Sequence, residues 1–463
     1  MQSSGGLTRR QALRWSAAAA ASAVAGGVLT ACAGRGQAAP ARSLKNPVIL
    51  TWQPGTPGIA AGLARTAQEI LYQMTAPFRK ANPGVEIKLV FPMGFSGANV
   101  TGLAAAYAAG TGPDVAELSQ IPWVYPRSNF LLDLEPYVRA DNLDVTVWPA
   151  SAMEFCRSLS ALGKSSTGLY YLPAYVNVLA MAVNNGLIDN LGFLRPQPDW
   201  TYAEWAGLAQ KLTKPGNNPR AGMLLYWTEL PPSFLLHAFG GGYVDPTNNS
   251  RSGLTAPGTV AFFQWLTPLL NQGSVVTGNP WVQGLGSGYC GTELYQSAFM
   301  LEAIQQFAGL DWDFYLPPVG SAGRFTAGYL DVIGVSAGTK HPQLAYEFAK
   351  WLTWDKTFAS GMMQLSLRSP IRNDQWPQWI DTIKSVAPPL QNKNLSAFAD
   401  LATGVDGSTW AQRYFRYGNT AAVGIINSWL QKMFFEGVSP VEALTEADHQ
   451  ITSLETAMQA AQP

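Results

Sequence analysis

The spacing of apolar residues predicts alternating strands and helices in the first part of the chain. Residues 84–91 (GVEIKLVF) alternate apolar and polar side chains, as in a strand with one buried face, and 46–52 (NPVILTW) and 113–118 (PDVAEL) predict two more strands. Apolar residues between 67 and 78 recur at the spacing of one helix face, and 99–110 (NVTGLAAAYAAG) predicts a helix that ends at a glycine. Such a strand–helix repeat favours right-handed crossovers and a mostly parallel sheet covered by helices.

Two later helices have sequence signals for their first turn. Thr201 with Glu204, and Ser439 with Glu442, match the capping box, in which each side chain bonds the other residue's backbone N–H. The second of these helices has one apolar stripe from residue 444 to residue 458, which predicts packing against the rest of the protein.

The length and the charge balance restrict the class of protein. A chain of 463 residues exceeds what one core usually supports, so we expect two lobes. Lys and Arg together number 30, as do Asp and Glu, and this balance gives no reason to expect a nucleic acid or an acidic membrane surface as the partner. Cys156 and Cys290 leave two alternatives open, a disulfide or two buried thiols.

The motifs that suggest cofactor or metal chemistry are weak, so we expect neither. Residues 286–291 (GSGYCG) fit G-x-G-x-x-G, but no apolar strand precedes them, which argues against a dinucleotide site. His237, His341 and His449 are the only histidines, and the local sequence pairs none of them with a nucleophile or with further metal ligands.

The N-terminus has the features of an export signal. Arg9 and Arg10 precede a weakly hydrophobic, alanine-rich run that ends at Cys32 and suits export better than a permanent membrane span. TRRQAL resembles the twin-arginine export motif, and LTAC resembles a bacterial lipobox, in which the cysteine becomes the lipidated first residue. We therefore predict a signal peptide over 1–31, a lipidated Cys32 with a tether over 32–46, and an exported protein anchored on the outer face of the cytoplasmic membrane.

Five parts of the chain, in order, resemble one protein family. They are MTAPFRKANPGVEIKLVF with LAAAYAAGTGPDV, GLYYLPAYVNVLAMAVNNGLI, PDWTYAEWAGLAQKLT, GYLDVIGVSAGTKHPQLAYEFAKWLT and FFEGVSPVEALTEADHQI. These stretches resemble the bacterial extracellular solute-binding proteins of family 1, the sugar-type binding proteins of ABC importers, which include the maltose-binding proteins. The resemblance covers nearly all of the chain after the leader and is weakest between Gly273 and Phe307.

The resemblance implies an α/β fold of two lobes, of the type II periplasmic-binding-protein kind, with the ligand in the cleft between them. The lobes and crossings that it implies are 47–174 plus 328–370 for the N-terminal lobe, 175–327 plus 371–463 for the C-terminal lobe, and crossings near 173–177, 325–331 and 369–373. It further implies a monomer without enzymatic activity. Such a protein would capture a neutral, carbohydrate-like solute by lobe closure and deliver it to an ABC permease.

The implied ligand contacts lie at strand ends and on the crossing segments. They are Trp52, Gln53, Glu117, Gln120, Trp123, Tyr175, Asn177, Trp227, Glu229, Tyr329, Asp331 and Trp410. Trp227 and Glu229 are two positions apart, so on an extended segment both project to one side, where a ring face beside a carboxylate suits a pyranose. The alternative at this place is a tryptophan of the lobe core beside a solvated glutamate.

Two other classes of protein stay open at this point. Glu117 and Glu229 could form the carboxylate pair of an exported carbohydrate-active enzyme, which turnover of a bound glycan would identify. A lipoprotein adhesin or scaffold would have no ligand cleft and would show no change on adding a small ligand.

Overall fold

The computed structural model describes most of the chain that follows the leader. The described residues are 47–55, 64–90, 98–118, 129–160, 168–216, 219–226, 230–278, 284–404, 415 and 419–461. The export signal, Cys32 and the tether lie outside these ranges, as do Gln120, Trp123, Trp227, Glu229 and Trp410 among the predicted ligand contacts.

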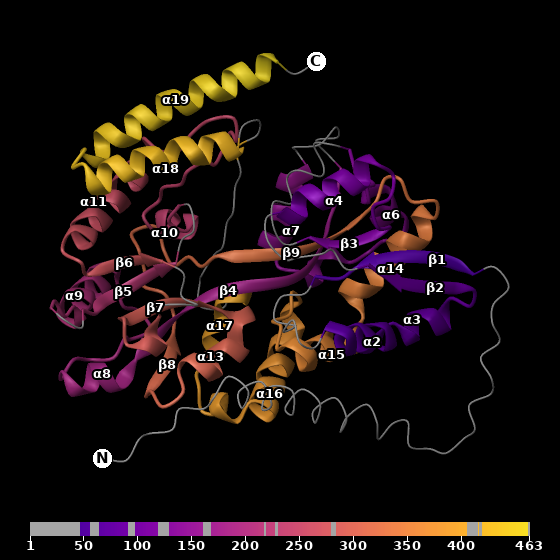
Figure 1. Cartoon of the computed structure of the whole chain (residues 1–463), viewed down its shortest axis with the longest axis horizontal. Coiled ribbons are helices and arrows are strands. Elements are labelled where there is room, and N and C mark those ends of the chain that lie inside the picture. Colours follow the sequence, from indigo (N-terminus) through magenta and orange to yellow (C-terminus); the bar gives the residue numbers. More distant parts are fainter. Residues whose placement is uncertain are drawn as a thin grey trace.

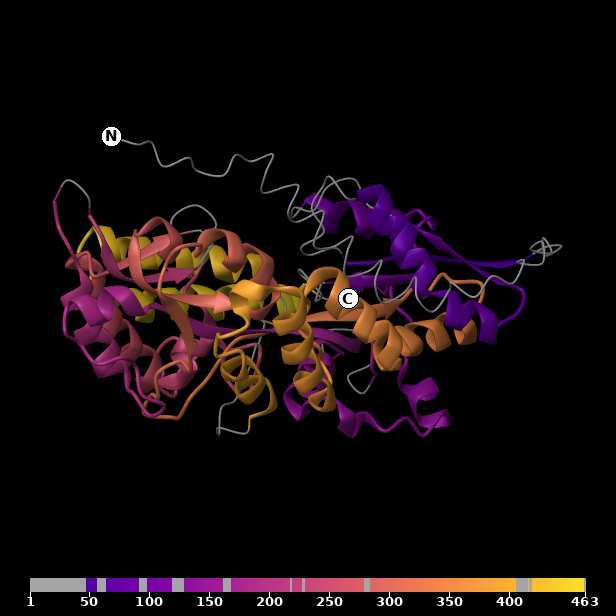
Figure 2. The same cartoon turned by 90° about the horizontal axis from the view of Figure 1, so that it is seen from below.

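One sheet of nine strands runs through the whole molecule in the order β2-β1-β3-β9-β4-β7-β5-β6, with β8 paired to β4. The strands are β1 (Val48–Gln53), β2 (Val85–Leu89), β3 (Val115–Leu118), β4 (Leu172–Asn184), β5 (Ala221–Tyr226), β6 (Val275–Gly278), β7 (Cys290–Gln296), β8 (Trp312–Tyr315) and β9 (Gly328–Val335). Residues 172–178 of β4 pair with β9, and residues 179–183 pair with β7. β4 therefore belongs to both halves of the molecule, and Figures 1 and 2 show it running with β9 between them.

The outer strands of each half are parallel, and the central strands are antiparallel. β1 is parallel to β2 and β3, and β5 is parallel to β6 and β7. β9 is antiparallel to β3 and β4, and β4 is antiparallel to β7 and β8. The predicted mostly parallel sheet is thus confirmed for the outer strands and wrong at the centre, because a chain that passes from one half to the other and back runs in opposite directions there.

Helices cover both faces of the sheet in each half (Figure 1). They are α2 (Ala64–Met74), α3 (Ala76–Ala81), α4 (Ala98–Ala108), α6 (Glu135–Ala140), α7 (Ala150–Ser160), α8 (Asn185–Asn190), α9 (Tyr202–Leu212), α10 (Ser233–Ala238), α11 (Pro257–Asn271), α13 (Met300–Gln306), α14 (Pro342–Trp354), α15 (Lys356–Ser366), α16 (Trp376–Val386), α17 (Ser396–Thr403), α18 (Asn419–Phe435) and α19 (Pro440–Ala460). The single helix predicted over 67–78 is two helices, α2 and α3, because Pro77 cannot donate the backbone hydrogen bond that a continuous helix needs there.

The capping box predicted for α9 is confirmed. The Glu204 N–H donates to Thr201 Oγ1 at 3.2 Å, and the Thr201 N–H donates to Glu204 Oε2 at 2.7 Å. At α19 one half of the predicted box forms, since the Glu442 N–H donates to Ser439 Oγ at 3.2 Å. In α19, Leu444 and Ile451 of the predicted apolar stripe are buried in the core, whereas the stripe's last residue is exposed.

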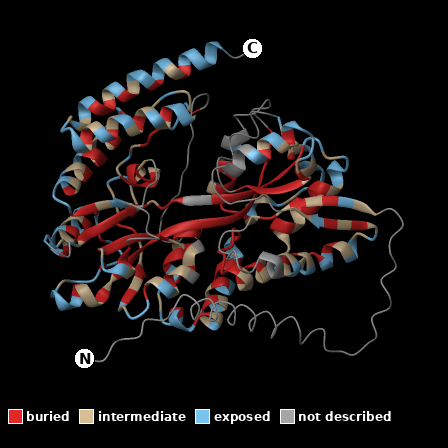
Figure 3. Ribbon diagram, in the orientation of Figure 1, coloured by how far each residue is buried: buried red, intermediate tan, exposed pale blue. Residues whose placement is uncertain are grey.

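The buried side chains form two clusters along the sheet, and Figure 3 colours the ribbon red at buried residues. The first cluster surrounds β1 to β3 and α14, and the second surrounds α9, α11, α18 and α19. Trp379 of α16 and Phe398 of α17 pack in the first cluster, although the sequence assigned 371–463 to the C-terminal lobe. The lobe limits given above stay a prediction.

Two further sequence questions concern the cysteines and the membrane. Cys156 and Cys290 are both buried thiols and are not joined in a disulfide, so the second of the two alternatives applies. Within the described ranges, no helix is long and apolar enough to cross a membrane.

Candidate functional site

A bulge in β4 aligns polar side chains on one face of the sheet where the two halves meet. The register between β4 and β9 shifts between Pro173 and Tyr175, after which Tyr175 pairs with Asp331 and Asn177 pairs with Tyr329. Paired residues of neighbouring strands share a face, and so do residues two positions apart. Tyr175, Asn177 and Asp331 therefore project from the same side of the sheet.

Glu117 of β3 extends this row on the same face. It pairs with Ile333 of β9, which is two positions from Asp331 and so faces the same way. The Gly55 backbone, just after the carboxyl end of β1, hydrogen-bonds the Glu117 carboxylate. A Cβ at Gly55 would lie 2.1 Å from Glu117 Oε1, so only glycine allows this approach.

An arginine that the sequence did not single out completes the row. Arg368 follows α15, and its guanidinium forms ion pairs with Glu117, at 2.5 Å, and with Asp331. It also lies over the Tyr175 ring, 3.8 Å from the ring centroid. We call Glu117, Tyr175, Asn177, Asp331 and Arg368 the crossing row.

Burial and mutual charge determine the ionisation of the crossing row. Burial raises the pKa of the Glu117 carboxyl above its usual range, although Arg368 opposes this. Burial would lower the pKa of Arg368, but Glu117 and Asp331 outweigh it and hold that pKa above its ordinary value. Burial, and then the Glu117 charge, also raise the pKa of the Tyr175 phenol. Arg368 is therefore charged at every relevant pH, and Tyr175 is neutral.

Several polar atoms of the crossing row have hydrogen-bonding capacity left. Asn177 is 7% exposed and Arg368 is 2% exposed. Within the described part of the chain, Asn177 Oδ1 and the Nε and Nη1 atoms of Arg368 have no hydrogen-bond partner. Leaving a buried polar group unpaired costs about 1–3 kcal/mol, so the row is set up to form further hydrogen bonds.

Hydroxyl groups connect the strands beside the row. Ser369 Oγ donates to the Val176 carbonyl at 2.5 Å and lies 2.8 Å from Ser297 Oγ. Thr326 Oγ1 accepts from the Leu179 N–H at 2.9 Å and donates to the Leu179 carbonyl at 2.8 Å. Three segments far apart in sequence are thus joined to β4 where it passes between the halves.

The remaining predicted contacts that the structure describes lie at the edge of this region or in the core. Trp52 is 2% exposed and packs edge-on against Phe348 in the core of the N-terminal half, with ring centroids 5.6 Å apart. Gln53 is half-buried at the end of β1. Tyr329 lies beside the row, where its backbone pairs with Asn177.

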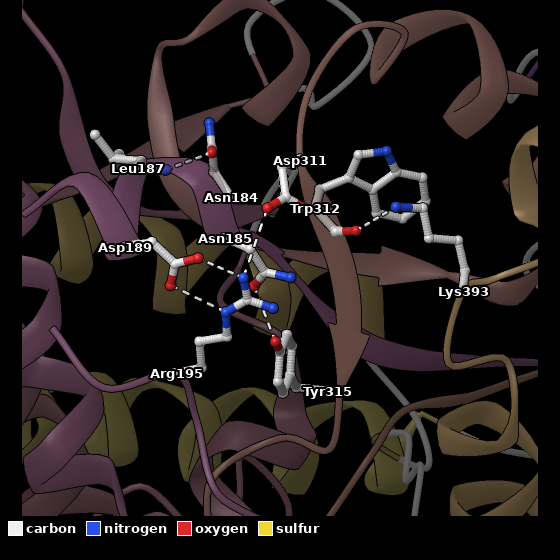
Figure 4. A network of polar contacts seen from close by, with 9 residues as sticks. All are labelled: Asn184, Asn185, Leu187, Asp189, Arg195, Asp311, Trp312, Tyr315 and Lys393. Carbon is white, nitrogen blue, oxygen red and sulfur yellow. Dashed lines mark hydrogen bonds and ion pairs between the residues drawn. The ribbon is translucent and has the colours of Figure 1, made fainter. Parts of the chain in front are cut away.

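A second polar network lies at α8 and β8, away from the crossing row (Figure 4). Arg195 hydrogen-bonds Asp189 and lies 3.6 Å from Asp311, and Tyr315 donates to Asn185 Oδ1 at 2.9 Å. The Arg195, Asp189 and Asp311 side chains are 42–60% exposed, so water competes for these contacts and the network ties surface elements together. No group of three or more potential metal ligands occurs in the described ranges.

Two α/β halves joined by shared central strands define a two-lobed fold of the type II periplasmic-binding-protein kind. The chain belongs to the bacterial extracellular solute-binding protein family, whose profile matches residues 60–356.

Three solved structures illustrate how widely this fold is shared. The chain is 18% identical to an ABC substrate-binding protein from Listeria monocytogenes in complex with cycloalternan, with a TM-score of 0.67 over 89% of this chain and 99% of the other. It is 16% identical to the sugar-binding protein MalE from Xanthomonas citri, with a TM-score of 0.68 over 89% and 98%. It is 15% identical to UgpB from Mycobacterium tuberculosis in complex with glycerophosphocholine, with a TM-score of 0.68 over 90% and 100%.

Proposed function

We propose that this protein is the substrate-binding component of an ABC importer and captures a neutral, carbohydrate-like solute between its two lobes. Family membership supports the binding role, and the solved structures of a complex with cycloalternan and of a sugar-binding protein support the class of ligand. The observation that carries the proposal is the crossing row, because it brings buried, unsatisfied polar groups to the junction of the two halves. Closure about β4, β9 and the segment near 369–373 would signal occupancy to the permease.

The proposed binding surface combines the crossing row with Gln53, Tyr329 and five residues outside the described ranges. Glu117, Tyr175, Asn177 and Asp331 would form its floor. Gln53, Gln120, Trp123, Trp227, Glu229, Tyr329 and Trp410 would supply stacking faces and hydrogen bonds around it. We leave Trp52 out of this surface because it packs in the core.

Calorimetric titration with a panel of neutral mono- and oligosaccharides tests the function. We expect binding of at least one of them, with the ligand recovered unchanged. Trp227→Ala should weaken that binding by about thirtyfold, since a buried aromatic anchor contributes on the order of 2 kcal/mol. Glu229→Gln should also weaken it and leave the melting temperature of the ligand-free protein nearly unchanged. If Trp227→Ala binds with full affinity but has a strongly lowered melting temperature, this residue belongs to the core and does not contact the ligand.

We also propose that the mature protein begins at a lipidated Cys32 and stays on the outer face of the membrane as a monomer. The twin arginines Arg9 and Arg10 and the LTAC sequence support this proposal. Cys32→Ser should abolish lipidation and release the protein from the membrane fraction, as mass spectrometry and fractionation of the native host would show. Arg9→Lys with Arg10→Lys should leave precursor in the cytoplasm, and normal export of that variant would indicate the general secretory route.

A further inference from the structure

The long strand β4 changes its pairing partners on both of its edges as it passes from one half to the other. On one edge, residues 172–178 pair with β9 and residues 181–184 pair with β8. On the other edge, a bridge from Tyr175 to the segment after α15 is followed by the pairing of residues 179–183 with β7. Residues 176–180 therefore span both changes of partner.

A threonine hydroxyl bonds β4 on the edge that β9 and β8 share. Thr326 lies two positions before β9, whose first residue is already paired with β4. The Thr326 Oγ1 atom accepts from the Leu179 N–H at 2.9 Å and donates to the Leu179 carbonyl at 2.8 Å. One side chain thus makes at Leu179 the two hydrogen bonds that a neighbouring strand makes elsewhere in an antiparallel ladder.

Two serine hydroxyls bond β4 on the opposite edge. Ser297 directly follows β7, and its Oγ accepts from the Val178 N–H at 3.2 Å. Ser369 Oγ donates to the Val176 carbonyl and lies 2.8 Å from Ser297 Oγ. Since a serine has one hydroxyl proton, Ser297 is the donor in the bond between the two serines. Both serines and the threonine are fully buried, so they connect β4 without solvent between them.

We infer that Ser297, Thr326 and Ser369 are positioning residues for lobe closure, and that β4 bends at the residues they bond. We call these three side chains the hinge hydroxyls. A hydroxyl hydrogen turns about its C–O bond to follow a moving partner, whereas a backbone group in a ladder is fixed by its own strand. The hinge hydroxyls therefore keep the backbone of residues 176–179 hydrogen-bonded while the halves move. This inference rests on the proposed function, because closure on a ligand is part of it.

Thr326→Val tests the hinge hydroxyls at nearly constant side-chain size. It takes the hydroxyl away from the Leu179 N–H and carbonyl, and buried groups are costly to leave unpaired. Water reaches these groups only when the halves move apart, so the variant should favour the more open form. Without ligand, its radius of gyration from small-angle X-ray scattering should exceed that of the wild type. Its Leu179 amide should exchange with deuterium at least about tenfold faster.

Two further variants separate the hydroxyl from the rest of the side chain. Thr326→Ser keeps the hydroxyl and should return the radius of gyration and the exchange rate to the wild-type values. Ser369→Ala removes the donor to the Val176 carbonyl and should act in the same direction as Thr326→Val. It also provides the test if Thr326→Val does not fold.

Saccharide affinity gives a second measurement on the full chain. The probes are maltotriose, mannotriose and trehalose, titrated by calorimetry. For each probe that the wild type binds, Thr326→Val and Ser369→Ala should bind about tenfold more weakly, because a smaller share of the protein is in the form that closes on the ligand. Thr326→Ser should bind as the wild type does.

Thr259→Val is the matched control for Thr326→Val. Thr259 is also fully buried, and its Oγ1 accepts from the Gly242 N–H at 2.9 Å and donates to the Gly253 carbonyl at 2.9 Å. It therefore bridges two backbone segments as Thr326 does, but both belong to the C-terminal half. Thr259→Val should lower the free energy of unfolding in urea and leave the radius of gyration and the saccharide affinity unchanged.

The outcomes distinguish the hinge from a purely structural role. If Thr326→Val and Ser369→Ala match the wild type in radius of gyration and in affinity, and lose only stability as Thr259→Val does, the inference is overturned. If the wild type binds none of the three saccharides or any other neutral sugar, the proposed function fails. The scattering and exchange of the ligand-free variants test the hinge hydroxyls in either case.

Discussion

At the scale of single residues, Glu293 is an ionisable group buried inside the C-terminal half. It is fully buried at the centre of the sheet, opposite Ala182 of β4 and Leu224 of β5. The Leu285 N–H donates to its Oε2 at 2.9 Å, whereas its Oε1 has no hydrogen-bond partner among the described residues. Burial raises the pKa of Glu293 to about 7, although the hydrogen bond from the Leu285 N–H lowers it in part. The folded protein therefore holds this proton more tightly than the unfolded chain does.

The protonation of Glu293 predicts that stability decreases as the pH rises. An acid whose pKa is raised by folding stabilises the protein below its ordinary pKa of 4.5, and the contribution is lost as the pH rises to about 7. Each unit of the rise in pKa from 4.5 to about 7 is worth about 1.4 kcal/mol. The free energy of unfolding therefore falls by about 3 kcal/mol in all. Glu293→Gln should flatten the pH dependence of the free energy of unfolding, measured with urea between pH 5 and 8. Glu446→Gln, on the exposed face of α19, is the control; a slope unchanged by Glu293→Gln would contradict this explanation.

The crossing row shows what sequence reasoning can find at single positions. Glu117, Tyr175, Asn177 and Asp331 were predicted from a family resemblance, and they meet because strand register and the bulge after Pro173 align them. Arg368 was missed, although an arginine in SLRSPIR directly before the predicted return near 369–373 was a usable signal. Its partners are 37 and 251 positions away in sequence, and only the tertiary fold brings them together. The role of Trp52 could not be decided from the sequence, because a strand-end tryptophan has the same pattern in a core as in a cleft; in the structure it packs edge-on against Phe348.

At the scale of elements, the packing of α9 on β5 depends on a glycine. A Cβ at Gly222 would lie 1.8 Å from the Ala209 carbonyl oxygen, so β5 can approach the helix this closely only without a side chain. Gly207, on α9 itself, has no atom within 4 Å of where its Cβ would be. The same substitution should therefore have opposite effects at Gly222 and at Gly207.

Gly222→Ala should be strongly destabilising, because backbone atoms cannot yield as a flexible side chain does. We expect a loss of about 3 kcal/mol or more, at the upper end of overpacking effects. Gly207→Ala should instead stabilise by about 0.5–1 kcal/mol through its higher helix propensity. Chemical unfolding of both variants measures the difference. Equal effects of the two substitutions would show that α9 and β5 do not pack as described.

The sequence predicted the helices and strands better than it predicted how the strands pair. The capping box of α9 and the strand limits near β1 to β3 depend on neighbouring residues, and they agree with the structure. The antiparallel pairing of β9 with β3 and β4 joins residues at least 150 positions apart, and no short-range pattern specifies it. That pairing joins the strands of the two α/β halves into one continuous sheet.

At the scale of the whole molecule, β4, β9 and the segment after α15 connect the two halves within the described part of the chain. β4 and β9 are paired along the crossing, and the segment after α15 joins them through a bridge between Tyr175 and Pro370. The hydroxyls of Ser369, Ser297 and Thr326 add hydrogen bonds to β4 at the same place. Such an arrangement can absorb a backbone change while each half moves as a rigid body.

We therefore predict that ligand binding closes the molecule about this crossing. The radius of gyration, measured by small-angle X-ray scattering, should decrease when a saturating neutral saccharide is added. Trp227→Ala at the same saccharide concentration should keep the larger value, because it populates the bound form far less. Hydrogen exchange should slow in β4 and β9 in the bound state, since both strands lie beside the proposed ligand. A scattering profile that does not change at saturation would contradict closure and leave the family assignment standing, because the family rests on the match over residues 60–356 and not on motion.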